Sequence, residues 1–335
     1  MNPIQEIFPF LQEAKKVVIT THQKPDPDAL GSSLGLYHFL VQFGHKVSVI
    51  SPTNWATWLN WMPGCENVID FELNRDKATE VINSADWVFC LDFNTISRTK
   101  NLTALLENCK GKRILIDHHQ QPDTKQFAYG ISNINKSSTC ELVYDLIVDS
   151  GNGGKINLQI AECLYAGVMA DTGSFRFPSA HASTHHMVAA LKEKGLEHTK
   201  VHEAVYDNFL ENRLRFIGYV LMNRMDVFYE FNTALIAITK KDLLRFQVKT
   251  GDTEGLVNYP LSIQGIKLAA LVIDRDEERK WSFRSKGDFD TNTFARNYFL
   301  GGGHFSASGG RSSESLDQTV QHFLKAMKEN AAQLQ

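Results

Sequence analysis

Short β-branched runs alternate with segments of helical period along the first part of the chain. The runs are KVVITT, KVSVIS, DWVFCLDF and RILIDHH, and LGSSLGLYHFLVQFG between the first two has the helical period. This βαβ alternation predicts an α/β fold with a mostly parallel sheet flanked by helices. Because such folds bind ligands outside the carboxyl ends of their strands, the residues that follow each run are the first candidates for a site.

The pattern changes twice further along the chain. Helices are predicted over residues 138–150 and 157–171, and a charged helical stretch without a strand signal then extends to about residue 225. Beyond it, strands come as hairpins before helices, which predicts a smaller α+β domain with a mixed or antiparallel sheet. We therefore expect a first domain at 1–190, a helical connector at 191–225 and a second domain at 226–335.

Composition fits a globular protein of two domains. The chain has 335 residues, of which 43% are hydrophobic and 22% charged. The first 16 residues predict an amphipathic helix without the apolar run of a secretory signal, and no later run is long enough to span a membrane. We expect a cytoplasmic protein without a membrane partner, whose scattered cysteines, never spaced as CxxC, are reduced core residues.

The net charge of the chain is −3, which argues against a wide nucleic-acid surface, because such a surface normally needs a basic excess. This charge leaves room for a small anion pocket. Any nucleic-acid ligand is therefore expected to be short.

Three side chains of metal-ligand type leave the end of the first predicted strand: His22, Asp26 and Asp28. Pro25 and Pro27 favour an extended path for the residues before them. The two carboxylates, two positions apart, should therefore point the same way before a helix begins near residue 29. Asp28 alone could simply cap that helix.

Further candidates follow two other predicted strands and one helix. Asp92 ends DWVFCLD, Asp117, His118 and His119 end RILIDHH, and Asp171 closes the helix GVMAD. Asp92 alone could begin a turn, and Asp171 alone could be an ordinary loop carboxylate. In a parallel sheet, however, all these strand ends lie on one edge.

The convergence of four carboxylates and two imidazoles predicts a metal site. Bare carboxylates in a partly buried cleft would repel one another, and two divalent cations would cancel their charge. A ligand set of carboxylate oxygens and imidazoles, without a thiolate, favours Mn²⁺ over structural Zn²⁺. Mg²⁺ or Co²⁺ are the alternatives. The predicted metal ligands are His22, Asp26, Asp28, Asp92, His118 and Asp171. The histidines without metal-ligand spacing to these motifs are predicted to be surface or packing residues: His38, His45, His181, His185, His186, His198, His202 and His322.

Four motifs resemble, in order and spacing, those of the DHH phosphoesterase superfamily: HQKPDPDALGSS, LDFN, IDHH and GVMADTGSFRF. FRS at 283–285 and GGGH at 301–304 resemble the associated domain that follows the DHH domain in short-chain exonucleases. Within the superfamily the chain is similar to the group of nanoRNases that also act as 3′-phosphoadenosine 5′-phosphate phosphatases. The resemblance covers nearly the whole chain.

The resemblance implies two metal sites that share Asp92 as a bridge: one made by His22, Asp26 and Asp92, the other by Asp28, Asp92, His118 and Asp171. His119 would face the scissile phosphate, and Asp117 would orient the neighbouring imidazole. Two such metals lower the pKa of a water and clamp the phosphoryl oxygens during in-line attack.

The second domain would bind the substrate through Arg284, Ser285, Gly302, Gly303 and His304. The glycines would allow close backbone approach, and Arg284 would also stabilise developing charge, as a catalytic residue beside Asp117 and His119. The alternative for GGGH is a flexible turn. Members of the family often have GGGHRNAAGG where this chain has GGGHFSASGG, a departure that bears on substrate preference more than on chemistry.

We therefore expect a Mn²⁺-dependent phosphoesterase that hydrolyses very short RNA or DNA oligomers to nucleoside monophosphates and dephosphorylates 3′-phosphoadenosine 5′-phosphate. A phosphodiesterase for cyclic dinucleotides or their linear products would use the same chemistry and stays open. A non-catalytic scaffold is a third reading, against which the complete ligand set argues. Hydrolysis of polyphosphate or pyrophosphate is disfavoured because the lysine-rich second domain of those relatives is absent. The sequence leaves the oligomeric state open, a homodimer included.

Overall fold

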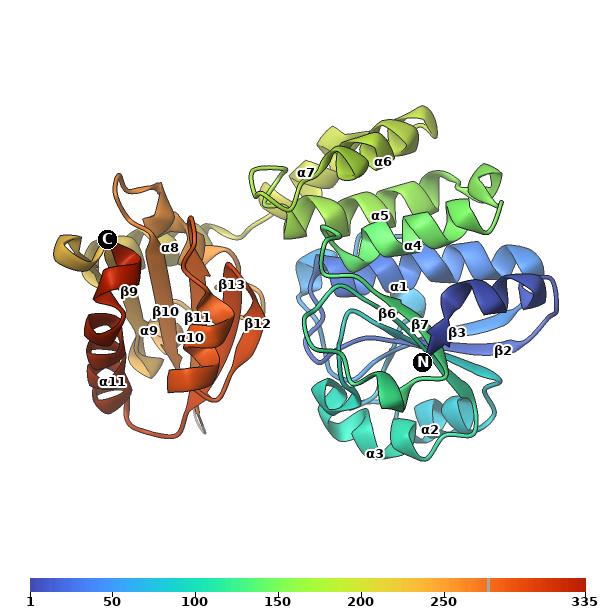
Figure 1. The fold of residues 1–335 in the computed structure, drawn as a ribbon, viewed down its shortest axis with the longest axis horizontal. Helices are drawn as coiled ribbons and strands as arrows, with labels where there is room; N and C mark the ends of the chain where they lie inside the picture. Colours follow the sequence, from blue (N-terminus) through green and yellow to red (C-terminus); the bar gives the residue numbers. More distant parts are fainter. Residues whose placement is uncertain (276–277) are drawn as a thin grey trace. The chain divides into compact units, whose positions relative to one another are not determined.

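The computed structural model describes residues 1–275 and 278–335 and consists of two units, Met1–Asn208 and Phe209–Gln335 (Figure 1). The division falls inside the segment predicted as a connector. Residues 276–277, which belong to the predicted hairpin of the second half, lie outside the described residues.

The first unit contains a seven-stranded sheet in the order β1-β7-β6-β5-β2-β3-β4, with every neighbouring pair parallel. This confirms the predicted α/β class. The four predicted strands are β2, β3, β5 and β6, whereas the short strands β1, β4 and β7 carry too little pattern to be predicted. The bounds are β1 Asn2–Pro3, β2 Lys16–Thr20, β3 Lys46–Ser51, β4 Ile69–Asp70, β5 Trp87–Leu91, β6 Lys112–Asp117 and β7 Tyr129–Ser132.

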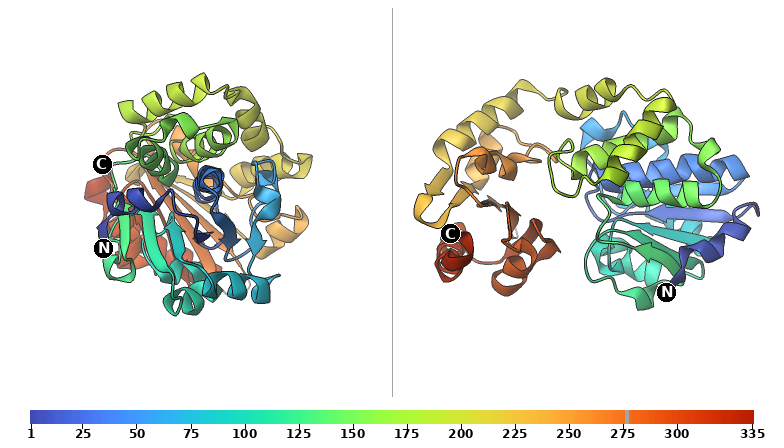
Figure 2. Two further views of the ribbon diagram at one scale, coloured as in Figure 1. Left: turned by 90° about the vertical axis from the view of Figure 1, so that its right-hand side faces the viewer. Right: turned by 45° about the horizontal axis from the view of Figure 1, so that its top comes forward.

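Helices cover both faces of this sheet. Helices α1, α4 and α5 share one apolar core with the sheet, α2 and α3 share a second core on the opposite face, and α6 and α7 pack outside α5 (Figures 1 and 2). The helices predicted at 138–150 and 157–171 are α4 and α5. The bounds are α1 Pro27–Leu40, α2 Arg75–Asn83, α3 Thr103–Glu107, α4 Thr139–Asp149, α5 Leu158–Asp171, α6 Ala182–Glu193 and α7 His198–Tyr206.

Two glycines let α5 approach its neighbours closely. A Cβ on Gly31 of α1 would lie 2.4 Å from the carbonyl oxygen of Cys163. A Cβ on Gly167 of α5 would lie 2.3 Å from Sγ of Cys140 and 2.7 Å from Oδ1 of Asp28. Close packing of α1, α4 and α5 therefore places the start of α1 directly against α5.

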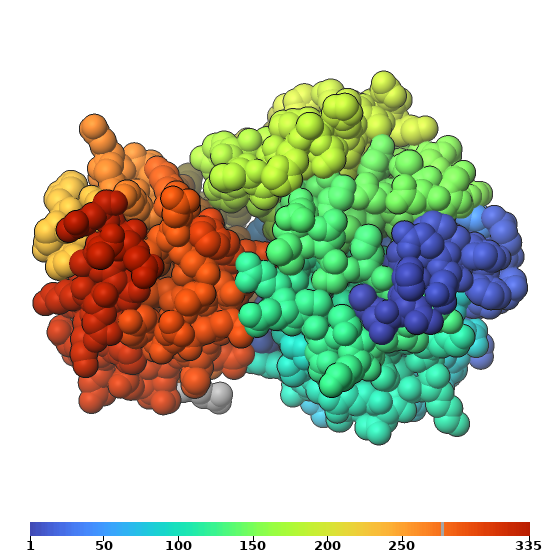
Figure 3. All heavy atoms as spheres, viewed as in Figure 1, coloured from blue at the N-terminus to red at the C-terminus, as the bar shows by residue number. Residues whose placement is uncertain are grey.

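The amino-terminal segment differs from its prediction as an amphipathic α-helix. It forms the short strand β1 and a 3₁₀ helix, η1, at Ile4–Phe10, on the surface of the first unit (dark blue in Figure 3). Pro9 lies inside this segment and has no N–H to donate, which disfavours a regular α-helix there. Ile4 and Ile7 are nevertheless buried, as the amphipathic pattern predicts.

The second unit contains a six-stranded sheet in the order β12-β13-β11-β10-β9-β8. Strands β9 and β10 are parallel and the other pairs antiparallel, which confirms the predicted mixed sheet. Helices α10 and α11 pack on one face of this sheet, and helices α8 and α9 pack on the other face. The bounds are α8 Glu211–Asn223, β8 Met225–Phe228, β9 Thr233–Ile238, α9 Lys240–Arg245, β10 Leu268–Asp274, β11 Arg279–Ser285, α10 Thr291–Tyr298, β12 Gly302–His304, β13 Ala307–Ser312, α11 Leu316–Glu329 and α12 Ala331–Leu334.

All five cysteines of the chain are buried and free. Within the part of the chain that the structure describes, no helix is both long and apolar enough to cross a bilayer.

Candidate metal centre

The carboxyl ends of three neighbouring strands, β2, β5 and β6, meet at one edge of the first sheet. Thr20 at the end of β2 lies opposite Cys90 of β5, and Leu91 at the end of β5 lies opposite Ile116 of β6. This register brings the residues that follow each strand together, as the βαβ pattern predicts.

Asp92 lies at the centre of the cluster and is almost fully buried. Its Oδ2 lies 3.3 Å from Nε2 of His22, and its Oδ1 lies 3.5 Å from Nε2 of His118 and 3.6 Å from Nδ1 of His119. The backbone of Asp92 has φ 63°, in the left-handed region that residues other than glycine rarely adopt. Such strain is typical of functional positions, where the surrounding structure imposes it.

Asp26 has an extended backbone, as expected before a proline, but Asp28 lies in the first turn of α1. The prediction that both carboxylates lie on one extended segment is therefore wrong. Pro27 is the first residue of α1, because proline is well tolerated in the first turn of a helix. Asp26 caps α1 through Oδ1, which accepts hydrogen bonds from the amides of Asp28 and Ala29, both at 3.0 Å. Its Oδ2 faces His22 at 3.9 Å. Asp28, in the first turn, instead faces Nε2 of His118 at 3.7 Å.

The two predicted imidazole ligands present Nε2 to the carboxylates. Nδ1 of His22 lies 2.8 Å from the carbonyl oxygen of Gln23, and Nδ1 of His118 lies 3.3 Å from that of Lys136. Asp171 at the end of α5 completes the group, with Oδ2 3.3 Å from Nε2 of His118. A metal-binding histidine usually donates its other ring N–H to a carbonyl or carboxylate, so both imidazoles fit the role of ligand.

The electrostatics of the cluster favour bound cations. Burial and the charge of Asp92 raise the pKa of Asp28 to about 7, and burial and the charge of Asp28 raise the pKa of Asp171 well above its ordinary value. Burial would also raise the pKa of Asp92, but hydrogen bonds from His118 and His22 hold it well below its ordinary value. Burial lowers the pKa of His118, yet its hydrogen bond to Asp92 and the surrounding carboxylates raise it to about 10. Divalent cations would relieve the repulsion that disfavours the ionised carboxylates.

Within the first unit, three sets of donor atoms are close enough to share an ion, and each contains Asp92: His22, Asp26 and Asp92; Asp28, Asp92 and His118; Asp92, Asp117 and His119. The structure therefore brings together all six residues predicted as metal ligands, since Asp171 joins through His118.

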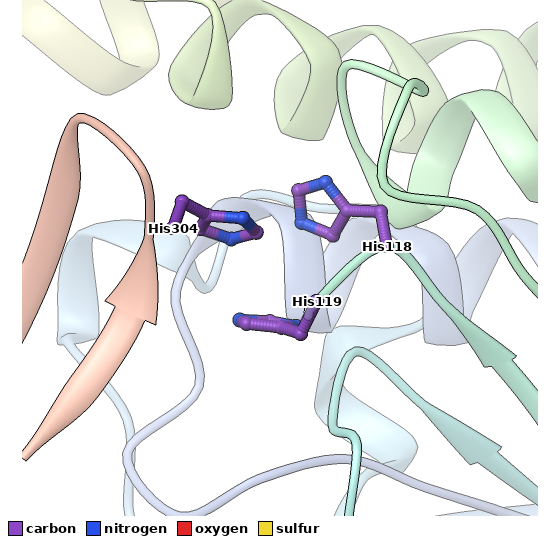
Figure 4. A group of neighbouring side chains, drawn as sticks. All are labelled: His118, His119 and His304. Atoms are coloured by element: carbon purple, nitrogen blue, oxygen red, sulfur yellow. The ribbon is translucent and has the colours of Figure 1, made fainter. Parts of the chain in front are cut away.

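Asp117 and His119 form a tight pair beside this cluster. Oδ1 of Asp117 lies 2.7 Å from Nδ1 of His119, and Oδ2 of this buried carboxylate has no hydrogen-bond partner among the described residues. His118 and His119 leave the end of β6 next to each other with their rings at a steep angle (Figure 4). Burial lowers the pKa of His119.

The start of α4 supports the cluster in a way that the sequence analysis missed. The amides of Thr139 and Cys140 donate to Oδ2 and Oδ1 of Asp28 at 2.7 and 2.9 Å, and the hydroxyl of Thr139 donates to Oδ1 of Asp92 at 2.9 Å. The available signal was the predicted start of a helix at Ser138, which caps α4, because the first amides of a helix have no partner within the helix and favour anions.

Arg98 is a second residue that the sequence analysis missed. It lies in the 3₁₀ helix η5, Ile96–Leu102, and its carbonyl oxygen accepts a hydrogen bond from the amide of Gln23 at 3.1 Å. Its positive charge is close enough to oppose protonation of both His22 and His119. Among the described residues its guanidinium makes no ion pair with a carboxylate.

The predicted substrate-binding residues, which come from the second half of the sequence, lie in the second unit around the β12–β13 hairpin. Arg284 of β11 pairs with Ala307 of β13, and His304 ends β12 and projects from the hairpin (Figure 4). Gly303 has φ 154°, and a Cβ there would lie 2.6 Å from the carbonyl oxygen of Ala307. The glycine cluster belongs to a hairpin in which β12 pairs antiparallel with β13. Ser285 is buried and its hydroxyl donates to the carbonyl of Phe289.

Comparison with known proteins gives matches along both units. Residues 16–168 match the DHH family, N-terminal domain, and residues 232–333 match the DHHA1 domain. The bifunctional oligoribonuclease and PAP phosphatase NrnA of Bacillus subtilis is 28% identical over 88% of this chain and 88% of its own length. An exopolyphosphatase-related protein from Bacteroides fragilis has a solved structure that is 37% identical, with a TM-score of 0.93 over 99% of this chain and 97% of that one. RecJ of Thermus thermophilus in complex with Mn²⁺ is 13% identical and shares the fold, with a TM-score of 0.56 over 99% of this chain and 55% of its own.

Proposed function

Since this chain belongs to the DHH family of phosphoesterases and is a hydrolase of phosphoric ester bonds, we propose that its substrates are small nucleotides. It releases nucleoside monophosphates from very short oligonucleotides, and it dephosphorylates 3′-phosphoadenosine 5′-phosphate. The relative from Bacillus subtilis is named for both activities. The observation that carries the proposal is the grouping of carboxylates and imidazoles around Asp92. Such a group suits metal-assisted hydrolysis of a phosphoester.

We propose that the group holds two divalent cations, with Mn²⁺ preferred. One would be bound by His22, Asp26 and Asp92, and the other by Asp28, Asp92, His118 and Asp171. Carboxylate and imidazole donors suit Mn²⁺ or Mg²⁺, and the RecJ structure that shares this fold contains Mn²⁺. When bound, the cations would supply positive charge to the phosphoryl oxygens and acidify a water.

Asp117 and His119 are proposed to move a proton. In the neutral imidazole, Nδ1–H donates to Oδ1 of Asp117, so Nε2 carries the lone pair. Burial lowers the pKa of His119, and the charge of Arg98 acts in the same direction, which keeps the ring neutral near pH 7. Nε2 would accept a proton from water beside the scissile phosphate, and Asp117 would stabilise the imidazolium that results.

Cationic side chains are proposed to bind the anionic substrate. Arg98 stands beside the cluster without a carboxylate partner among the described residues, which supports a contact with the phosphoryl group. Arg284, His304 and the backbone of the hairpin in the second unit are proposed to bind the part of the substrate distant from that phosphate.

The test is a turnover assay on the metal-stripped protein with Mn²⁺ or Mg²⁺ restored. The substrates are a dinucleotide, 3′-phosphoadenosine 5′-phosphate, a cyclic dinucleotide and inorganic polyphosphate. We expect the wild-type chain to release a mononucleotide from the dinucleotide and phosphate from 3′-phosphoadenosine 5′-phosphate, faster with Mn²⁺ than with Mg²⁺. The Asp92→Ala variant should release neither product. Turnover of only the cyclic dinucleotide would favour the alternative reading, and turnover of only polyphosphate or of none of the four would contradict the proposal.

A further inference from the structure

Glu141 is a buried carboxylate that no step of the proposed reaction uses. It lies in the first turn of α4 and is 1% exposed. Its Oε2 accepts hydrogen bonds from the amide and hydroxyl of Ser137, at 3.0 and 2.6 Å, and from the hydroxyl of Thr184 at 3.2 Å. Its Oε1 accepts from Nζ of Lys136 at 3.0 Å and from the hydroxyl of Ser183 at 2.7 Å. Every partner is a donor, so an acceptor-only group fits this position.

The segment that Glu141 holds is the one that supports the candidate metal ligands. Residues 136–140, which we call the support segment, contact three of the six. The carbonyl of Lys136 faces Nδ1 of His118 at 3.3 Å, and Thr139 donates to both Asp28 and Asp92. Glu141 anchors the beginning of this segment through Lys136 and Ser137.

Glu141 also holds the segment that follows the GVMADTGSFRF motif at residues 167–177. Ser183 and Thr184 open α6, and between this helix and Asp171 lies a turn in which Gly173, Ser174 and Phe175 all have positive φ, of 55°, 57° and 63°. Left-handed residues in succession are costly, and the surrounding structure must fix them. One carboxylate therefore ties the support segment to the helix that follows this turn.

Hydrogen bonding keeps Glu141 charged. Burial would raise its pKa, but the hydrogen bonds from Ser137, Ser183 and Lys136 lower it to about 2. Lys136 also pairs with Asp145 at 2.7 Å. The carboxylate is thus ionised and paired at any pH suitable for an assay.

We infer that Glu141 is a positioning residue that holds the support segment against Asp28, Asp92 and His118 and thereby sets the affinity of the centre for divalent cations. This inference rests on the proposed function. The competing explanation is that Glu141 only braces α4 against α6.

Calorimetric titration of the metal-stripped full chain with Mn²⁺ separates the two. We expect Glu141→Gln to weaken Mn²⁺ binding roughly 10-fold, because its amide N–H would face donors and displace the support segment. Asp242→Asn is the matched control: Asp242 is buried, pairs with Arg224, and hydrogen bonds hold its pKa at about 2, but it belongs to the second unit. That control should lower the melting temperature and leave the dissociation constant for Mn²⁺ unchanged.

A wild-type dissociation constant in Glu141→Gln would overturn the inference and leave the proposed function intact. Failure of the wild-type chain to bind Mn²⁺ would contradict the proposed function itself. If Glu141→Gln does not fold, Ser137→Ala, which removes one hydroxyl of the same network, should weaken Mn²⁺ binding several-fold, and an unchanged constant would overturn the inference. Relative to the wild type, Glu141→Gln should lose more kcat at limiting Mn²⁺ than at saturating Mn²⁺. An equal loss of kcat at both Mn²⁺ concentrations would count against a positioning role for Glu141.

Discussion

The hydroxyl of Thr139 donates a hydrogen bond to Oδ1 of Asp92 at 2.9 Å, although the two residues are 47 positions apart. The same oxygen faces Nε2 of His118 at 3.5 Å. The side chain of Asp92 is therefore oriented by α4 and by the end of β6 together. A carboxylate fixed in this way is preorganised, which is what a shared ligand of two cations requires.

Asp92→Ala should abolish hydrolysis, because both proposed cations lose a ligand that no neighbour replaces. The loss should appear mainly in kcat, and it should exceed the roughly 10- to 100-fold typical when only a hydrogen-bond partner of a ligand is removed. Steady-state kinetics with a dinucleotide and Mn²⁺ give the comparison. Thr139→Val, which removes only the hydrogen bond to Asp92, is the control and should remain within that smaller range. Near-normal turnover of Asp92→Ala would rule out a bridging role.

Removal of divalent cations should lower thermal stability, and more so at pH 8 than at pH 5. The folded metal-free chain binds a proton at Asp28 with a pKa of about 7, against an ordinary value of 3.8. Because the folded state then binds more protons than the unfolded state, its free energy of unfolding falls as the pH rises from about 4 to about 7. Saturating cation should restore about 3 kcal/mol at roughly 100-fold above the dissociation constant.

The measurement is a melting curve with and without chelator at both pH values, on protein shown by metal analysis to be loaded. Glu141, whose pKa is lowered to about 2, loses its stabilising contribution only between about pH 4.5 and 2, so it does not confound the comparison at pH 5. Identical curves in the presence and absence of chelator would argue against a cluster of converging carboxylates.

Gly167→Ala should weaken both stability and metal binding. The added Cβ would lie 2.3 Å from Sγ of Cys140 and 2.7 Å from Oδ1 of Asp28, so α5 and the start of α1 must separate. Overpacking of this kind costs about 1–3 kcal/mol. Gly218→Ala, within helix α8 where a Cβ meets no atom within 4 Å, is the matched control and should stabilise the chain by roughly 0.5–1 kcal/mol. Urea unfolding and Mn²⁺ titration of both variants test the prediction; wild-type values for Gly167→Ala would refute it.

Arg284→Ala and His304→Ala should impair natural substrates selectively. If the second unit binds the distant nucleotide as proposed, that binding would help to hold the scissile phosphate in line, so loss of Arg284 should raise KM and lower kcat for a dinucleotide. An activated ester such as a p-nitrophenyl phosphodiester offers no such nucleotide. For that ester both variants should remain close to wild type, whereas His118→Ala should lose nearly all activity.

Arg98→Ala provides the contrast, because a residue that contacts the phosphoryl group should affect the dinucleotide and the activated ester alike. The decisive quantity is kcat/KM for a dinucleotide, 3′-phosphoadenosine 5′-phosphate, a longer oligomer and the activated ester in each variant. Equal losses on every substrate for Arg284→Ala would place Arg284 in the catalytic centre itself.

The sequence alone determined the class of each domain and the residues of the cluster. Period-2 and helical patterns are local properties, and they located β2, β3, β5 and β6 and the helices α4 and α5. The position of Asp92, Asp117 and His118 directly after buried strands was sufficient to predict their convergence, because the carboxyl ends of neighbouring parallel strands share one edge. Motif order then indicated the family.

Only the tertiary structure decided how the cluster is held. The pattern did not show that Asp28 belongs to the first turn of α1, because the two prolines are compatible both with an extended segment and with a helix start. Nor did it place Thr139 on Asp92, Arg98 beside His22, or Glu141 between the support segment and α6. These contacts join residues far apart in the chain, and hydrogen bonds at 3 Å depend on strand register, helix packing and side-chain rotamers, which no local pattern encodes.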